Sequence, residues 1–215
     1  MTDPNYTALL LVIDRSGSMA SIREDMIGGL QTLLDSQAAD EGRLTVDVVD
    51  FDDEIVLRHT MADPATLKIE LDPRGSTALY DAIGISMQGF GERLAALPED
   101  ARPETVQVIV VTDGQENASH EYNAAAVRTL ITKQKNEYSW DFVFLGANQD
   151  AVLTGSALGF DAESSLTFAA SGQEVHSMSE SLNRYVKDVR GKTKEGFSTR
   201  ERQQAAPATS KETGV

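Results

Sequence analysis

The stretch TALLLVIDRSGSM, residues 7–19, decides how the rest of the chain is organised. Residues 9–13 form an uninterrupted apolar run rich in branched side chains, which predicts a strand buried on both faces of a parallel sheet. Directly after this run come Asp14, Ser16 and Ser18, one carboxylate and two hydroxyls at every second position. Because open α/β sheets bind ligands at the carboxyl ends of their strands, this polar cluster is a candidate site.

The chemistry of the triplet is that of hard oxygen ligands. A small divalent cation prefers near-octahedral oxygens at about 2.0–2.1 Å and keeps some of its waters. One carboxylate and two neutral hydroxyls leave such an ion incompletely neutralised, so it can accept a further anionic oxygen from outside. The alternative is that Ser16 and Ser18 only cap the next helix and that Asp14 only ends the strand. The triplet alone does not decide between these two interpretations.

Length and composition are those of one globular α/β domain. The 215 residues are 40% hydrophobic and 25% charged, and none is a cysteine. The absence of cysteine excludes disulfides and thiolate chemistry and is typical of a reducing compartment. The sequence begins MTDPN, without the basic and apolar regions of a signal peptide, and no apolar run approaches the length of a membrane span. We therefore expect a cytoplasmic protein with no membrane partner.

The charge of the chain is strongly negative. Its formal net charge is −15, and residues 192–215 carry five basic and three acidic side chains, which leaves −17 for residues 1–191. Such a surface repels phosphate backbones, and no basic stripe counters it, so we expect no nucleic-acid partner. The same charge attracts divalent cations in general, so weak metal binding is by itself little evidence for a specific site.

Apolar periodicity predicts alternating strands and helices along the chain. Helices are expected at 19–38, 78–97, 121–137, 149–158 and 173–190, and further strands at 44–51, 55–57, 106–111, 141–145 and 165–168. The turn Asp52-Asp53 is too short for a parallel crossover, so the strand after it should run antiparallel. The pattern predicts a doubly wound, Rossmann-like three-layer sandwich whose mostly parallel sheet has one antiparallel edge strand.

All of these elements fall within one predicted domain, residues 1–191. From Lys192 onwards the apolar content collapses, and Phe197 stands alone among polar residues. We expect residues 192–215 to form a disordered polar tail.

Two further strand-to-helix junctions carry oxygen ligands. Thr77 lies in the turn before the helix at 78–97, and Asp113 ends the strand at 106–111. In a doubly wound sheet the carboxyl ends of neighbouring strands meet near a topological switch point, so loops remote in sequence converge there. We therefore expect Thr77 and Asp113 to join the polar cluster of the first loop.

Three segments resemble the metal-ion-dependent adhesion site (MIDAS) of the von Willebrand factor type A (vWA) domain. They are Asp-x-Ser-x-Ser after the first strand, Gly-Ser-Thr-Ala-Leu-Tyr-Asp-Ala-Ile at 75–83, and Val-Thr-Asp-Gly at 111–114. Motif order, spacing and flanking elements match the family over roughly residues 5–190, and all five liganding positions match. The resemblance implies a Mg²⁺ site, with Mn²⁺ able to substitute, at the carboxyl edge of a mostly parallel six-stranded sheet.

The resemblance also implies a role for each residue. Ser16 and Ser18 would bind the metal directly, and Thr77 would bind it directly or through water, according to the conformational state. Asp14 and Asp113 would act largely through water and hydrogen bonds. Little negative charge then touches the ion, which stays attractive to a partner's Glu or Asp. A switch of Asp113 or Thr77 between direct and water-mediated contact would couple affinity to loop position.

Residues near the candidate site each have two interpretations. Asp81 either orients the turn by hydrogen bonds or is an ordinary acidic residue in the first turn of a helix, which is the interpretation we favour. Glu116 and Asn117 either rim the site or belong to a solvated loop. Asn148 and Asp150 are better explained as helix capping residues than as part of the rim.

The remaining chemistry-bearing residues give no sign of a site. The histidines, His59, His120 and His176, are scattered without the spacing of metal ligands, and we expect each at the surface. Trp140 precedes a buried strand and is expected to pack in the core.

Three functions are compatible with these patterns. The favoured one is a non-enzymatic, metal-dependent protein–protein interaction module in an intracellular assembly, whose partner supplies Asp or Glu to the cation. The alternative is a Mg²⁺-dependent phosphoryl-transfer enzyme with Asp14 as nucleophile and Asp113 as metal ligand. Haloacid-dehalogenase-type phosphatases need a carboxylate where this chain has Ser16, and neither a P-loop nor a Gly-x-Ser-x-Gly elbow occurs. Third, the site could be vestigial and partners could bind another surface.

Overall fold

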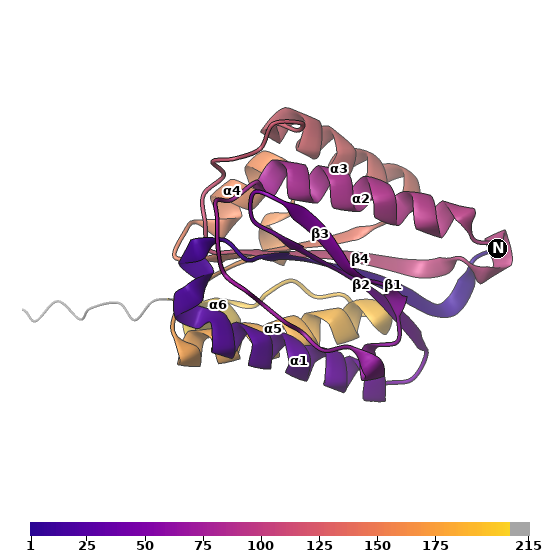
Figure 1. The fold of residues 1–215 in the computed structure, drawn as a ribbon. Coiled ribbons are helices and arrows are strands. Elements are labelled where there is room, and N and C mark those ends of the chain that lie inside the picture. The colour runs from indigo at the N-terminus through magenta and orange to yellow at the C-terminus, as the bar shows by residue number, and fades with distance from the viewer. Residues whose placement is uncertain (207–215) are drawn as a thin grey trace, which may run out of the picture.

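A six-stranded sheet lies between two layers of helices in the computed structural model, which describes residues 1–206 (Figure 1). The strands are β1 (Asp3–Asp14), β2 (Arg43–Phe51), β3 (Ile55–Ala62), β4 (Pro103–Thr112), β5 (Asp141–Ala147) and β6 (Ser165–Phe168). Their order is β3-β2-β1-β4-β5-β6, and β3 runs antiparallel to β2 while the other neighbouring pairs are parallel. The predicted doubly wound sandwich with one antiparallel edge strand is confirmed.

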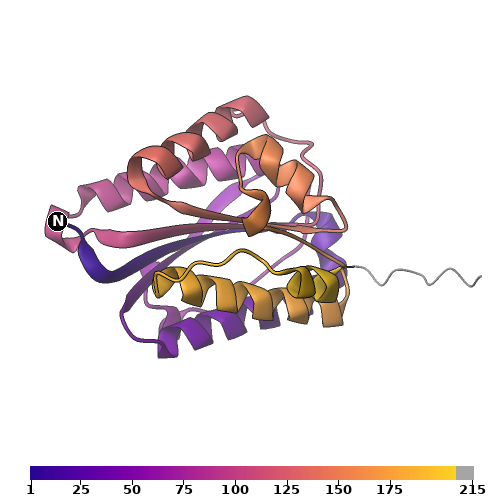
Figure 2. The same cartoon turned by 180° about the vertical axis from the view of Figure 1, so that it is seen from behind.

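Helices cover both faces of the sheet. They are α1 (Arg23–Ala39), α2 (Leu79–Ala96), α3 (Ala124–Tyr138), α4 (Ala151–Leu158), α5 (Gly172–Arg190) and α6 (Thr199–Ala205). Helices α1, α5 and α6 lie on one face and α2, α3 and α4 on the other, as the view from behind also shows (Figure 2). None of the helices formed by residues 1–206 combines the length and the apolar character that crossing a membrane requires.

The central strand β1 contributes to the core on both sides of the sheet. Leu9, Leu11 and Ile13 belong to the cluster that packs against α1 and α5. Leu10 and Val12 belong to the cluster under α2 and α3. All five side chains are at most 1% exposed. The apolar run at the start of the quoted stretch is therefore the doubly buried strand that its composition predicted.

The antiparallel edge strand β3 is longer than the predicted 55–57 and contains a bulge. Met61 has a φ of 43°, a conformation that a residue with a side chain seldom adopts. The buried Asp47 of β2 accepts the Met61 N–H at 2.6 Å and pairs with the Arg93 guanidinium at 2.6 Å. A side-chain carboxylate thus replaces the backbone acceptor that the bulge removes.

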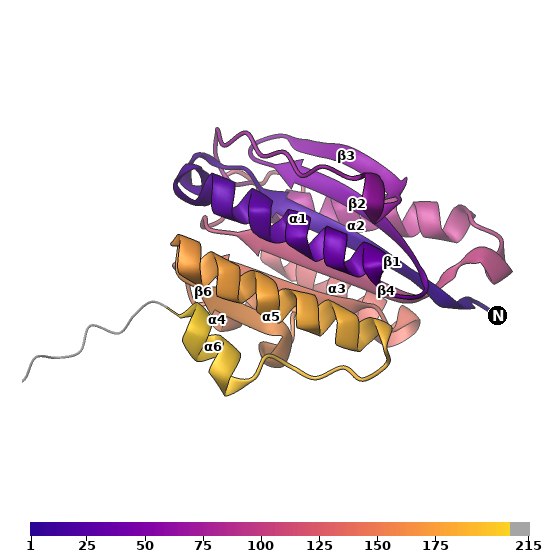
Figure 3. The ribbon, with the colours of Figure 1, turned by 90° about the horizontal axis from the view of Figure 1, so that it is seen from below.

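The prediction of a disordered tail is wrong for residues 192–206, which we call the C-terminal strap. Phe197 is 6% exposed and stacks on Tyr185 of α5 with ring centroids 5.1 Å apart. The Ala205 carbonyl accepts the Ala169 N–H at 2.9 Å. Figure 3 shows α6 of the strap beside α5 and β6. The domain therefore extends beyond residue 191, and the rest of the predicted tail, residues 207–215, lies outside the described residues.

Candidate functional site

Three loops meet at the carboxyl edge of the sheet. The first loop (residues 15–22) follows β1, the second loop (72–78) precedes α2, and the third loop (113–123) follows β4. Strands β1 and β4 are neighbours, and the chain leaves β1 towards β2 on one side before it returns to β4 on the other. This is the topological switch point of the sheet, where ligand sites of doubly wound folds lie.

Hydrogen bonds connect the first loop with the third. Asp14 is fully buried, and its Oδ1 accepts the Ser16 N–H at 2.7 Å while its Oδ2 accepts the Thr112 hydroxyl at 2.6 Å. The Oγ atoms of Ser16 and Ser18 are 3.1 Å apart. The Ser18 hydroxyl donates to Asp113 Oδ1 at 2.6 Å. Four of the five predicted residues therefore form one continuous polar chain.

The fifth predicted residue, Thr77, reaches the same place from the second loop. Its N–H donates to Asn117 Oδ1 at 2.9 Å, and its carbonyl accepts the Asn117 N–H at 3.0 Å. A Cβ added to Gly114 would lie 2.6 Å from Thr77 Oγ1 and 3.4 Å from Asp14 Oδ2. Glycine thus leaves free a space between Thr77 and Asp14 that a side chain would fill. The structure brings all five residues together.

The two carboxylates carry raised pKa values. Burial raises the pKa of Asp14 from 3.8 to about 6, although hydrogen bonds from Thr112 and Ser16 oppose the shift. Burial also raises the pKa of Asp113, against the hydrogen bond from Ser18. A cation between these groups would stabilise both ionised forms, because an opposite charge within about 4–6 Å lowers a carboxyl pKa. The electrostatics of the site therefore favour a bound cation.

Asp81 and Glu116 hold the third loop against the start of α2. The Asp81 carboxylate, 6% exposed, accepts the N–H groups of residues 120–122 at 2.6–2.9 Å. Glu116 accepts the Tyr80 N–H at 3.0 Å and the Ser119 hydroxyl at 2.8 Å. Our preferred interpretation of Asp81 as an ordinary first-turn acid is wrong, because it orients a loop by hydrogen bonds. Glu116 and Asn117 likewise fix the loops that carry the site.

The residues after β5 are structural. Asp150 accepts the Leu153 N–H at 2.9 Å and so caps α4, which confirms the capping prediction for this residue. Asn148 accepts the Ala170 N–H at 3.1 Å and ties the end of β5 to the segment after β6. His120 and His176 are exposed and His59 is partly exposed.

Trp140 packs in the core, as predicted. It is 8% exposed and lies against Phe90 in an edge-to-face contact, with ring centroids 5.7 Å apart.

The donor set at the three loops consists of oxygen atoms only. Within residues 1–206, no three histidine, cysteine, aspartate or glutamate side chains gather to hold a metal ion. The candidate site instead offers two carboxylates and three hydroxyls, and such hard oxygen ligands suit Mg²⁺ or Mn²⁺. Because Gly114 leaves space beside Thr77 and Asp14, the residues fit a small cation.

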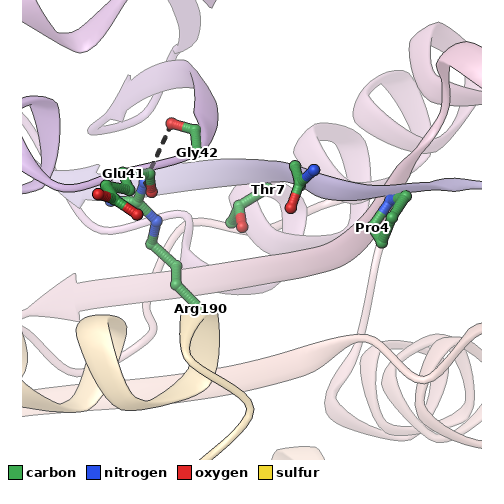
Figure 4. A pocket seen from close by; sticks show the side chains of 6 residues that line it. Pro4, Thr7, Glu41, Gly42 and Arg190 are labelled. Atoms are coloured by element: carbon green, nitrogen blue, oxygen red, sulfur yellow. Dashed lines mark hydrogen bonds between the residues drawn. The ribbon is translucent and has the colours of Figure 1, made fainter.

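A cavity of about 420 Å³ lies at the opposite edge of the sheet (Figure 4). It is lined by Pro4, Asn5, Thr7, Glu41, Gly42 and Arg190. The Arg190 guanidinium donates to Gln37 O at 2.7 Å, Gln37 Oε1 at 2.8 Å and the Glu41 carbonyl at 3.0 Å. These hydrogen bonds connect α5 to the end of α1 and to the segment between α1 and β2. Because they already occupy the guanidinium, which is the charged group of this cavity that α5 supplies, we do not assign the candidate site to the cavity.

Comparisons with known proteins bear on the fold. No protein-family model matches the chain, and neither does any curated protein. Proximal thread matrix protein 1 (PTMP1) from the mussel byssus superposes with a TM-score of 0.62 at 17% identity, over 86% of this chain and 46% of that chain. The vWF domain of the type V pili tip protein Mfa5 from Porphyromonas gingivalis superposes with a TM-score of 0.63 at 11% identity, over 90% of this chain and 98% of that domain.

These likenesses define an α/β protein with the vWA fold. The identities are low, so the similarity is one of fold alone. The chain spans about half the length of PTMP1 and almost the whole Mfa5 domain. A further PTMP1 structure, with a TM-score of 0.56 at 17% identity over 87% of this chain and 46% of that chain, contains a zinc-occupied MIDAS motif.

Proposed function

We propose that this chain is a metal-dependent protein–protein interaction module. Ser16, Ser18 and Thr77, supported by Asp14 and Asp113, would hold Mg²⁺, with Mn²⁺ able to substitute. The observation that carries the proposal is the convergence of five oxygen-bearing side chains from three loops on one edge of the sheet. The zinc-occupied MIDAS of PTMP1, a protein of similar fold, supports it.

The hydrogen-bond pattern orients the hydroxyls for a cation. Ser18 gives its hydrogen to Asp113 and accepts the Ser16 hydroxyl, which leaves one lone pair on Ser18 Oγ and the lone pairs of Ser16 Oγ for a cation. Asp14 is buried and accepts a hydrogen bond from the Ser16 backbone N–H, whereas Ser18 is exposed to solvent. A bound divalent ion would supply positive charge with room for a partner's Asp or Glu.

The phosphoryl-transfer alternative has no support from the geometry. A nucleophilic carboxylate needs an oxygen that can reach phosphorus, but Asp14 is fully buried and both its oxygens accept hydrogen bonds. We therefore propose a binding module and not an enzyme. Phosphoester turnover that disappears in Asp14→Asn would contradict this assignment.

The proposed partner is a protein that presents one acidic side chain on a neutral or basic surface. The chain carries a net charge of −15, so a broadly acidic partner would be repelled. The same negative charge disfavours binding of nucleic acid. Both the absence of a nucleic-acid partner and the cytoplasmic location remain predictions from the sequence.

Calorimetric titration with Mn²⁺ tests the metal site. We expect the wild type to bind with a Kd of about micromolar to millimolar, because the partner's carboxylate is missing. Ser18→Ala should weaken binding at least about tenfold, which corresponds to 1.4 kcal/mol. Ser21→Ala is the matched control, since Ser21 lies on the same turn and its hydroxyl reaches only the Ser18 carbonyl at 3.5 Å. Identical titrations of all three proteins would refute the assignment.

A further inference from the structure

A buried ion-pair network lies beside the candidate site and joins two of its loops. Arg15, between Asp14 and Ser16, is 2% exposed, and its Nη2 lies 3.2 Å from the Asp52 carboxylate. Arg74 of the second loop donates from Nε to Asp52 Oδ2 at 2.9 Å. One carboxylate, at the turn between β2 and β3, therefore pairs with an arginine from each loop.

Backbone hydrogen bonds join the same segments as these ion pairs. The Arg15 N–H donates to the Phe51 carbonyl at 2.7 Å, and the Ala78 N–H donates to the Asp52 carbonyl at 2.8 Å. The Arg74 N–H donates directly to the Arg15 carbonyl at 2.7 Å. Asp52 thus contacts both loops through its side chain and the second loop through its main chain as well.

We propose that Asp52 is a positioning residue that sets the separation between the hydroxyls of the first loop and Thr77. Ser16 directly follows Arg15, and Thr77 directly precedes Ala78, so a shift at Asp52 moves ligands in both loops. The consequence for metal binding rests on the proposed function, whereas the link between the loops does not.

The charges within the ion-pair network balance one another. Three cations, Arg15, Arg58 and Arg74, contact three carboxylates, Asp50, Asp52 and Glu54. These charges cancel, so the network adds no net charge to the site.

Loss of the Asp52 charge would leave Arg15 poorly held. Its remaining buried partner is Asp50, whose Oδ1 is 3.5 Å from Arg15 Nε, and neither of these two atoms has a hydrogen-bond partner among the described residues. A buried charge left without its partner is costly, so the loop should rearrange to reach water.

A matched control exists on the strand that precedes Asp52. Asp47 of β2 is as buried as Asp52, pairs with Arg93 and accepts the Met61 N–H. It contacts neither the first nor the second loop. Asp47→Asn should therefore cost stability without changing the loops, which separates positioning from stabilisation in general.

Amide hydrogen exchange of the metal-free full chain tests the link directly. We expect Asp52→Asn to accelerate exchange about tenfold or more in residues 15–18 and 74–78 together, and Asp47→Asn to leave both segments unchanged. Arg74→Gln changes a half-exposed side chain and should accelerate exchange less, but in the same two segments. If Asp52→Asn does not fold, the Arg74→Gln variant tests the link between the loops. Acceleration in neither loop, or equally in Asp47→Asn, would overturn the proposal.

Mn²⁺ calorimetry measures the consequence. Asp52→Asn should raise the Kd about tenfold and Asp47→Asn by less than about twofold. Should the wild type bind no Mn²⁺, the proposed function fails while hydrogen exchange still decides the role of Asp52. Should the wild type bind and Asp52→Asn bind equally well, the positioning role is refuted and the metal site stands.

Discussion

Asp14 is the residue at which the stability of the metal-free fold and the proposed function oppose each other. Its pKa rises from 3.8 to about 6 because burial disfavours the charged form. At neutral pH the ionised carboxylate therefore costs the metal-free fold about 3 kcal/mol. The folded pKa lies above the unfolded one, so the folded state binds more protons between these values, and stability falls as the pH rises from about 4 to 6.

Asp14→Asn should accordingly stabilise the metal-free protein at neutral pH. The amide keeps the size of the side chain and removes the buried charge. Urea denaturation in EDTA should show a stability relative to the wild type that grows by about 2 kcal/mol between about pH 4.5 and about pH 7.5. The same variant should lose its response to Mn²⁺. An equal change of stability at both pH values would mean that the pKa of Asp14 is not raised in the folded protein. A loss at both pH values that is smaller at pH 7.5 would mean that the hydrogen bonds to Ser16 and Thr112 outweigh the charge.

The sequence identifies the site residues that follow strands but not the residues that hold them. Asp14 and Asp113 each end an apolar run, so strand prediction alone places them at the carboxyl edge. The sequence indicates Asp52 only as a turn residue, and it leaves loop orientation as the less favoured of two interpretations of Asp81. The groups that these two carboxylates hold in the second and third loops lie 22 to 41 positions away along the chain, and no local pattern encodes such a pairing.

At the scale of elements, apolar periodicity predicts the strands and helices that build the sandwich, but not the C-terminal strap. The strap offers few apolar side chains, and it is held largely by polar contacts. Arg184 of α5 pairs with Glu201 at 2.8 Å, and Arg202 donates to the Ser165 carbonyl of β6 at 2.7 Å. One local signal was present, because Ser198 and Glu201 form the capping box that starts α6.

Phe197→Ala should show that the strap belongs to the folded unit. Removal of a buried aromatic side chain costs about 3–5 kcal/mol in well-packed cores, and the peripheral position places this residue at about 3 kcal/mol. Phe197→Leu should retain most of that stability, since it keeps apolar volume on Tyr185. Urea denaturation measures both variants. A Phe197→Ala protein as stable as the wild type would mean that the strap contributes nothing to the core.

At the scale of the whole molecule, net charge affects every measurement of cation binding. The chain has 34 acidic and 19 basic side chains, and exposed pairs such as Lys187 with Asp40 are worth about 0–1 kcal/mol each. Repulsion among the unpaired carboxylates should therefore exceed what the surface pairs contribute. Any cation, specific or not, then stabilises the folded protein by screening this repulsion.

We therefore expect the melting temperature of the metal-free protein to rise as NaCl increases from about 10 mM to about 500 mM, where the Debye length falls to a few ångströms. Ser18→Ala should show the same rise, because the effect belongs to the whole surface and not to one site. At the higher salt concentration, added Mn²⁺ should raise the melting temperature of the wild type more than that of Ser18→Ala, which binds the ion at least about tenfold more weakly. A melting temperature that falls with NaCl would mean that ion pairs dominate the surface electrostatics. An equal Mn²⁺ response of both proteins at high salt would place the binding elsewhere on the acidic surface and remove the support for a site at the three loops.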